Sequence, residues 1–335
     1  MKILHLAHNK PVPGLYTPVF VKAVREIGEF DIAENGAQMT EPERAALIRQ
    51  YDVQIVDWGS ETAPPELAKN PGRLKYICNL TGSIRGFAGL ELLEAGILMT
   101  NWGDAPANGV AEGAFTLLLA ALKDLHRHIV ATRNGGWRLD GNTTGGSLKD
   151  LNVGVYGCGV IGLRFLEMLR PFGAVVRVFD PFAKEIPEWC IRVAGLDELF
   201  RRSQAIVIHA GLSDETRKSV TARHLALLPR YGVVINTARG AIVDHEALFA
   251  ELKSGRLRAG LDVTDPEPVP ADHECRQWEN LILSGHCIER GWPNEGKIPD
   301  HLTYMQRICL DNLRRFERGQ PLRFAFDRDR YLRST

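Results

Sequence analysis

Short apolar, β-branched runs alternate with segments of helical periodicity from the first residues of the chain. The runs KILHLAH, FDIA, VQIVDWG, LKYICNLTG and ILMTN are separated by helical patterns such as VFVKAVREIG and EPERAALIRQ. Strands that alternate with helices in this way predict a parallel β-sheet with helices on both faces. The first part of the chain is therefore expected to form a doubly wound α/β domain.

A second series of the same kind begins at Asn152. Its strands are NVGVYG, VVRVFD, AIVIHA, GVVINTA, LRAGLDV and NLILSGH, and their buried β-branched runs predict a second parallel sheet. Between the two series, Pro106 precedes an apolar-periodic segment, residues 107–133, that predicts one long helix leading out of the first domain. The closing segment 301–319 has helical periodicity but no strand of its own, so we expect it to pack on the first domain. The predicted domains are residues 1–101 with 290–335, and residues 102–289.

Composition narrows the class of protein. The 335 residues suffice for about two domains, and 41 basic residues balance 41 acidic ones, which argues against a nucleic-acid-binding surface. The longest apolar run, residues 115–122, is too short to span a bilayer, and MKILHLAHNK does not resemble a signal peptide. The six cysteines show neither zinc-ligand spacing nor a disulfide framework. We expect a cytoplasmic protein with no metal and no membrane partner.

A glycine-rich turn follows the first strand of the second series. Gly157, Gly159 and Gly162 form G-x-G-x-x-G between the strand NVGVY and a helical run, the context in which this motif predicts dinucleotide binding. The amides of Val160 and Ile161 would then face a pyrophosphate at the helix N-terminus.

Asp180 ends the next strand, near the spacing at which an acid binds the ribose hydroxyls. Because a carboxylate repels a 2′-phosphate, NAD(H) is favoured over NADP(H), although Arg177 lies close by in sequence. The structural alternative is a glycine-rich turn followed by an aspartate that caps a loop.

Three later strands each deliver a polar residue at or just beyond their carboxyl ends: Arg239 after GVVINTA, Glu267 after GLDV and His286 after LILSG. Ligands of open α/β sheets bind at this edge, so the three loops are expected to converge. His286 suits an acid/base role, Glu267 suits orienting its ring, and Arg239 suits binding a carboxylate. Each residue alone has an ordinary structural explanation, and it is their joint position that favours hydride transfer between an alcohol and a ketone.

The chain resembles the D-isomer-specific 2-hydroxyacid dehydrogenase family. The resemblance is dense from about Val153 to His286, through GCGVIG, VFDP, LDELFRRSQAIVIHAGLSDETR, INTARGAIVD, ELKSGRLRAGLDVTDPEPVP and NLILSGH, and weaker in GILMTN, VAE and NLRRFERGQPL. It implies a flavodoxin-like substrate domain and a Rossmann NAD-binding domain with an active-site cleft between them. It also implies cofactor contacts at Val160, Ile161, Asp180, Thr216, Thr237 and Asp262, and the catalytic set Arg239, Glu267 and His286.

The resemblance further implies a small 2-hydroxy or 2-keto acid substrate and a homodimer formed through the NAD-binding domain. The family's carboxylate-binding G-x-G-x-D loop matches residues 81–85, so Gly82, Ser83 and Arg85 are candidate substrate contacts beside Arg239. Arg85 stands in place of the family's Asp.

Two departures follow the last strand, where Gly285 replaces a Pro and Ile288 stands where a small residue is usual. Two alternatives stay open. The substrate is phosphorylated, as in phosphoglycerate dehydrogenases, or the protein is a co-repressor-like module that senses NAD(H).

Overall fold

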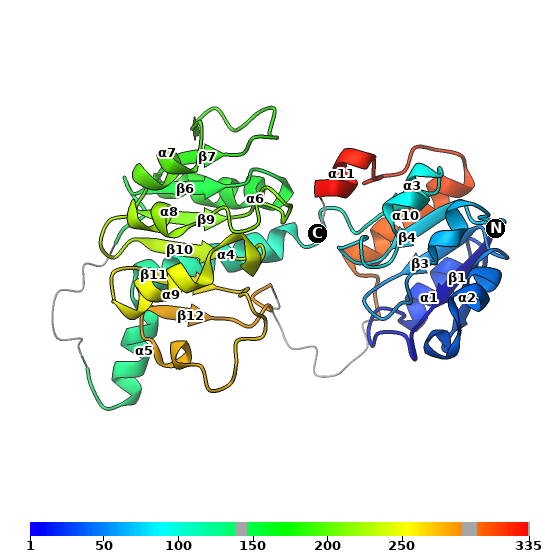
Figure 1. Ribbon diagram of the computed structural model, residues 1–335, viewed down its shortest axis with the longest axis horizontal. Helices are drawn as coiled ribbons and strands as arrows, with labels where there is room; N and C mark the ends of the chain where they lie inside the picture. Colours follow the sequence, from blue (N-terminus) through cyan, green and yellow to red (C-terminus); the bar gives the residue numbers. More distant parts are fainter. Residues whose placement is uncertain (138–145, 290–299, 334–335) are drawn as a thin grey trace. The chain divides into compact units, whose positions relative to one another are not determined.

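The computed structural model describes residues 1–137, 146–289 and 300–333, which form two compact units (Figure 1). Unit 1 comprises Met1–Ala105 with Trp292–Thr335, and unit 2 comprises Pro106–Gly291. These limits differ by a few residues from the sequence-based domains 1–101 with 290–335 and 102–289. Both units are parallel α/β sheets, which confirms the predicted fold class.

Unit 1 is built on a five-stranded sheet with the order β2-β1-β3-β4-β5, the flavodoxin-like order. Apolar side chains on its two faces form separate cores under the helices. The strands are β1 Lys2–Leu6, β2 Glu29–Ala33, β3 Val53–Val56, β4 Tyr76–Asn79 and β5 Leu98–Thr100. The helices are α1 Pro18–Arg25, α2 Glu41–Ile48, α3 Leu90–Glu94, α10 Tyr304–Glu317 and α11 Arg328–Arg333.

Unit 2 has a seven-stranded sheet with the order β12-β11-β10-β9-β6-β7-β8, which is the Rossmann order extended by a strand. Asn236 of β10 lies level with Ile208 of β9 and Leu261 of β11, so the carboxyl ends of these strands form one edge. The strands are β6 Asn152–Tyr156, β7 Val175–Phe179, β8 Ile191–Arg192, β9 Ala205–Ile208, β10 Val233–Asn236, β11 Arg258–Leu261 and β12 Leu281–Leu283. The helices are α4 Ala107–Leu122, α5 Leu125–Arg133, α6 Val160–Leu169, α7 Leu196–Arg201, α8 Ala222–Ala226 and α9 His245–Lys253.

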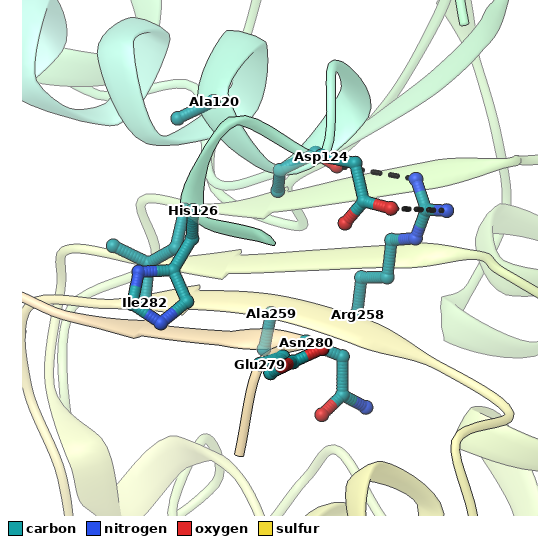
Figure 2. Close-up of a pocket in the computed structure, with 9 residues that line it drawn as sticks. Ala120, Asp124, His126, Arg258, Ala259, Glu279, Asn280 and Ile282 are labelled. Atoms are coloured by element: carbon teal, nitrogen blue, oxygen red, sulfur yellow. Dashed lines mark hydrogen bonds and ion pairs between the residues drawn. The ribbon is translucent and has the colours of Figure 1, made fainter. Parts of the chain in front are cut away.

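The prediction of one long helix over residues 107–133 was wrong, because the chain breaks between α4 and α5. Asp124 adopts a left-handed conformation, with φ 55° and ψ 32°, which the short polar side chain of Asp tolerates. Its carboxylate pairs with the guanidinium groups of Arg127 at 2.9 Å and Arg258 at 3.3 Å, and Figure 2 shows it turned toward Arg258. Apolar periodicity continues across the break, so the sequence pattern hides it.

The C-terminal segment packs on the first unit. Helix α10 contacts β4 and α1, and it begins with a capping box in which Thr303 and Gln306 satisfy each other's backbone amides. Beyond it, Ala325 forms an isolated antiparallel bridge with Thr100 at the end of β5. Helix α11 and the short strand β8 were not foreseen from the sequence. Within the described ranges, no helix combines the length and apolarity that crossing a bilayer requires.

Candidate active site

The glycine-rich turn joins β6 to α6 and is shaped by close backbone approaches. Gly157 has φ +98°, and a Cβ there would lie 2.4 Å from the backbone nitrogen of Ala210. A Cβ at Gly162 would lie 2.4 Å from the carbonyl oxygen of Gly157, whereas one at Gly159 meets nothing within 4 Å. The space beside Gly159 is therefore open at the start of α6. There the first-turn amides of Val160 and Ile161 have no acceptor within the helix.

Asp180 lies directly after β7 and faces this turn. One carboxylate oxygen accepts the amide of Cys158 at 2.7 Å, and the other accepts the amides of Phe182 at 2.8 Å and Ala183 at 3.0 Å. These bonds place a carboxylate beside the glycine-rich turn, where a ribose would lie. Its remaining lone pairs are available to ribose hydroxyls.

Two arginines, Arg177 and Arg192, are candidates for a positive charge near Asp180. Arg177 donates to the side chain of Asn152 at 2.7 Å, toward the amino end of β6, and therefore does not pair with Asp180. The cation next to Asp180 is Arg192 of β8, which donates to the Asp180 carbonyl oxygen at 3.3 Å. Arg192 was not predicted from the sequence, because the strand that carries it has only two residues.

The other three candidate cofactor residues occupy different environments. The hydroxyl of Thr216 accepts the amide of Ser213 and donates to the carbonyl of Gly211, both at 2.7 Å, so it stabilises its own loop. The Thr237 hydroxyl is buried and has no partner among the described residues. Asp262 uses one carboxylate oxygen to hold the loop that follows β12.

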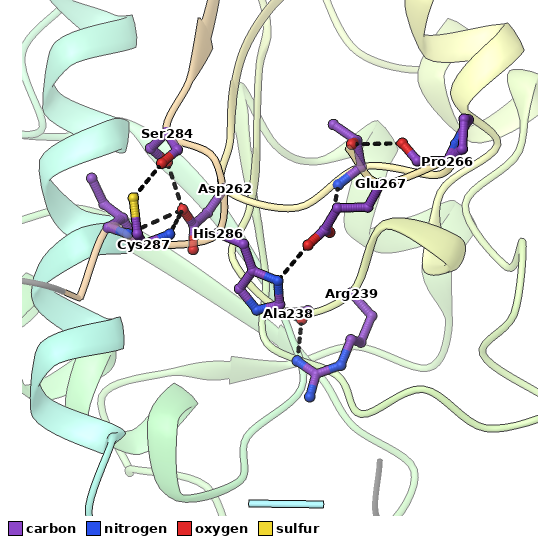
Figure 3. Close-up of polar contacts among 10 residues, drawn as sticks. Ala238, Arg239, Asp262, Pro266, Glu267, Ser284, His286 and Cys287 are labelled. Atoms are coloured by element: carbon purple, nitrogen blue, oxygen red, sulfur yellow. Dashed lines mark hydrogen bonds and ion pairs between the residues drawn. The ribbon is translucent and has the colours of Figure 1, made fainter. Parts of the chain in front are cut away.

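Glu267 and His286 meet at the carboxyl edge of the unit 2 sheet. His286 Nδ1 lies 2.6 Å from Glu267 Oε1, with the two side chains 48% and 40% exposed (Figure 3). Since a carboxylate only accepts, Nδ1 carries the proton and Nε2 is left to face a ligand. Within the described part of the chain, Nε2 has no hydrogen-bond partner. This is the arrangement that orients a histidine for proton transfer.

Backbone geometry and Asp262 set the position of His286. Gly285 and His286 have φ values of 65° and 57°, and the His286 amide donates to the Asp262 carbonyl at 2.6 Å. The Asp262 carboxylate accepts Ser284 Oγ at 2.7 Å and the Cys287 amide at 3.0 Å, on either side of the histidine. Asp262 is therefore a positioning residue for the histidine loop, a role that the sequence analysis did not assign.

Arg239 lies in the loop after β10, and Figure 3 shows its side chain beside the His286 ring. Its Nη1 donates to the carbonyl of Ala238 at 2.7 Å. Burial lowers the pKa of Arg239, and the nearby charge of Glu267 opposes that shift. The guanidinium stays a cation, and no carboxylate within the described ranges lies within ion-pair distance of it. A partly buried cation with no carboxylate partner among the described residues is suited to an anionic ligand.

The loops of Arg239 and Glu267 are held together by a close backbone contact. A Cβ at Gly240 would lie 2.0 Å from the carbonyl oxygen of Thr264. Within the loop that follows β11, the Thr264 amide also donates to Glu267 Oε2 at 3.4 Å. The three residues that sequence analysis grouped are thus brought to one place in unit 2.

The turn at residues 81–85 lies in unit 1, after β4. Asn79 Nδ2 donates to the Ser83 carbonyl at 2.5 Å, and Asn101 Nδ2 donates to the Gly82 carbonyl at 2.8 Å. With these carbonyls engaged, the amides of Gly82 and Ser83 donate to no other described residue. A Cβ at Gly82 would lie 2.8 Å from the Trp102 indole, so the turn packs closely on that ring. Arg85 follows in the same turn.

The pocket drawn in Figure 2 is a different feature. It is lined by Asp124, His126, Arg258 and Asn280 at the amino ends of β11 and β12, the edge opposite to the candidate catalytic residues. No group of three or more His, Cys, Asp or Glu side chains within the described ranges is placed to hold a metal ion.

Comparison with known proteins identifies the family. Residues 115–287 match the model of the D-isomer specific 2-hydroxyacid dehydrogenase NAD binding domain, which is more than half of the chain. The chain belongs to this family. The match confirms the resemblance found in the sequence, and the family's members are NAD-dependent oxidoreductases that act on CH–OH groups.

Individual relatives differ in the substrate that their names state. The chain is 30% identical over 246 residues to the hydroxypyruvate reductase of Thermotoga maritima, covering 72% of this chain and 78% of that enzyme. It is 29% identical over 270 residues to the D-3-phosphoglycerate dehydrogenase of Methanocaldococcus jannaschii, covering 79% of this chain but only 50% of the larger enzyme. The chain thus matches about half the length of that relative.

A solved structure shares the fold. An acyclic imino acid reductase in complex with NADPH and D-Arg superposes with a TM-score of 0.78 at 24% identity, covering 98% of this chain and 100% of that chain. This likeness shows that the two chains share the fold.

Proposed function

We propose that this protein is an NAD(H)-dependent oxidoreductase that interconverts a small D-2-hydroxy acid and its 2-keto acid. The observation that carries the proposal is the 2.6 Å contact between His286 Nδ1 and Glu267 beside the unpaired Arg239. An oriented imidazole next to a guanidinium matches a substrate in which the reacting carbon carries a carboxylate.

In the proposed reduction, Nε2–H of His286 donates a proton to the substrate's carbonyl oxygen as the hydroxyl forms. In oxidation, neutral Nε2 removes the hydroxyl proton. Glu267 accepts a hydrogen bond from Nδ1–H in both directions, keeps the ring in one orientation and stabilises the imidazolium form. Arg239 binds the carboxylate and polarises the adjacent carbonyl. When bound, the nicotinamide supplies the hydride for reduction and accepts it in oxidation.

The residues present fit a dinucleotide. The open space at Gly159 and the first-turn amides of Val160 and Ile161 form a cradle for the pyrophosphate. The buried Thr237 hydroxyl, which has no partner within the described ranges, is expected to gain one from the cofactor. Asp262 and Thr216 remain candidate contacts on the strength of the family resemblance.

A preference for NAD(H) over NADP(H) is part of the proposal. The Asp180 carboxylate beside the glycine-rich turn supports it, because this charge would repel a 2′-phosphate. Arg192 next to the Asp180 carbonyl is the cation that would oppose the preference. The two affinities are measured by titrating the protein with NADH and, separately, with NADPH while the quenching of tryptophan fluorescence is recorded.

In unit 1, the amides of Gly82 and Ser83 are proposed to hold the substrate carboxylate. Arg85 adds positive charge to the same turn. If it contacts a phosphate, phosphohydroxypyruvate will be reduced with a higher kcat/KM than hydroxypyruvate.

The deciding experiment is a screen of NADH oxidation against small 2-keto acids, repeated with His286→Asn. We expect the variant to bind NADH like the wild type and to lose turnover by roughly a hundredfold or more, the scale of acid/base catalysis. His301→Asn, at a unit 1 side chain that is 77% exposed, is the matched control and should keep full activity. Unchanged turnover of His286→Asn would remove this residue from the mechanism. NADH binding without reduction of any acid in the screen would favour the sensing module.

Association and location are also proposals. A homodimer formed through unit 2, in the region of residues 108–133, rests on the family resemblance, and light scattering measures the mass in solution. A cytoplasmic location and the absence of nucleic-acid partners rest on the sequence alone.

A further inference from the structure

We propose that Arg330, in the C-terminal helix α11, is a positioning residue for the carboxylate-binding turn, and that it acts through Asn101. The inference rests on the proposed function only in taking the ligand of the turn at residues 81–83 to be a 2-keto acid. The mechanism above assigns no role to Arg330 or to the segment that carries it.

The contacts form a chain of three groups. Arg330 Nη2 donates to Asn101 Oδ1 at 3.0 Å, and Asn101 Nδ2 donates to the Gly82 carbonyl at 2.8 Å. Asn101 Oδ1 also accepts the amide of Gly103 at 3.1 Å. A guanidinium and an amide N–H can only donate, and a carbonyl can only accept. The side-chain amide of Asn101 is therefore held in one orientation, with Nδ2 toward Gly82.

Holding the Gly82 carbonyl decides where the neighbouring amides point. The peptide unit is planar, so fixing the Gly82 oxygen also fixes the Ser83 N–H, which points the opposite way. Asn79 holds the next peptide in the same manner through the Ser83 carbonyl at 2.5 Å. Both asparagines accept an amide in their own turn, Asn79 from Thr81 and Asn101 from Gly103. Asn101 in addition accepts a guanidinium N–H from a residue 229 positions later in the chain.

Contacts of the C-terminal segment with β5 and Ala88 place Arg330 next to Asn101. Ala325 bridges to Thr100, and the Phe326 amide donates to the Met99 carbonyl at 2.9 Å, so the segment runs beside the edge strand that ends just before Asn101. The Tyr331 hydroxyl donates to the Ala88 carbonyl at 2.8 Å and anchors the helix.

Arg330 itself is held on several sides. Its Nη1 donates to the Ala325 carbonyl at 2.9 Å, and its guanidinium carbon lies 4.5 Å from the centre of the Phe326 ring. Burial lowers the pKa of Arg330, while Asp327 opposes the shift. A guanidinium buried in this way is retained at a cost in desolvation, which is consistent with a specific role.

The test compares Arg330→Met with Arg328→Met, the same change in the same helix. Among the residues that the structure describes, Arg328 pairs with Glu94 alone, at side-chain exposures of 64% and 52%, so its loss controls for the stability of α11. We expect Arg330→Met to raise KM for the 2-keto acid by roughly tenfold, the loss of about one charge-assisted hydrogen bond. The values of kcat and the NADH dissociation constant should stay within about twofold. Arg328→Met should match the wild type.

Two further variants separate positioning from simple docking of the helix. Arg330→Lys keeps a cation that can donate to Asn101 and should recover part of the KM. Asn101→Ala should raise KM at least as far as Arg330→Met, and the double variant should be no worse than Asn101→Ala alone, because one residue acts through the other. Additive effects, or an unchanged KM in Arg330→Met, would overturn the proposal.

Hydrogen exchange provides a readout that does not depend on the reaction. Amide exchange in the peptide that contains Gly82, Ser83 and Ile84 should be faster in Arg330→Met than in Arg328→Met. If the wild type reduces no 2-keto acid, the proposed function fails while this comparison still decides whether Arg330 orders the turn. Equal exchange in the two variants would refute the ordering role.

Discussion

His209 makes a quantitative prediction about acid stability. It follows β9 in unit 2, its ring is buried 5.0 Å from the ring of Phe165, and neither ring nitrogen has a partner within the described ranges. Burial without a partner disfavours the imidazolium and lowers the pKa from 6.5 to about 3. This apolar environment favours a structural role for His209.

The sign follows from proton linkage. Below pH 6.5 the unfolded chain binds a proton at His209, whereas the native protein does not bind one until about pH 3. The contribution of this neutral histidine to the free energy of unfolding is therefore full above pH 6.5 and is lost as the pH falls. Between pH 7 and pH 5 the loss from this one group is about 2 kcal/mol. For a unit of this size, that lowers the melting temperature by roughly 4–8 °C.

The measurement is scanning calorimetry of the wild type and His209→Leu at pH 7 and pH 5. His224 and His245 also have pKa values lowered mainly by burial, so the wild type should lose more than the share of His209. The difference between the two proteins isolates that share, and the variant should keep about 2 kcal/mol more of its stability on acidification. His301→Leu, at a side chain that is 77% exposed, should lose as much as the wild type. An equal acid loss in His209→Leu and the wild type would refute the reasoning.

Three further predictions concern the candidate site. Glu267→Gln keeps the size of the side chain but removes the charge that stabilises the imidazolium. We expect kcat to fall by about ten- to a hundredfold, less than for His286→Asn. An unchanged kcat would contradict the orienting role. Gly240→Ala places a Cβ 2.0 Å from the Thr264 carbonyl oxygen. We expect the free energy of unfolding, measured by urea titration, to fall by about 1–3 kcal/mol. An unchanged free energy of unfolding would show that the two loops separate easily. Asp180→Ser should reduce the ratio of NADH to NADPH affinity by about tenfold or more, and a ratio that does not move would assign the preference elsewhere.

The candidate catalytic set was predictable because strand ends carry it. In a parallel sheet the carboxyl ends of neighbouring strands form one edge, so residues that follow β10, β11 and β12 converge whatever the loops between them do. The structure brings Glu267 and His286 within hydrogen-bond distance. The glycine-rich turn could also be predicted, because the spacing of its glycines reflects close backbone contacts that only glycine permits, as at Gly157.

Other features left no periodic signal. The break at Asp124 depends on Arg258, which lies 134 positions away, so the local pattern predicts an unbroken helix. The roles of Asp262 and Arg330 are likewise invisible locally, because each acts through partners that are distant in sequence.

The amino-acid sequence by itself thus determined the two parallel sheets, and it singled out the glycine-rich turn and the candidate catalytic side chains. Hydrophobic periodicity and glycine spacing are local consequences of strand, helix and turn geometry. Only the tertiary structure decided which carbonyls and amides are held, where a helix ends and which distant cation orients an asparagine, because those outcomes depend on hydrogen bonds between segments that meet only after folding.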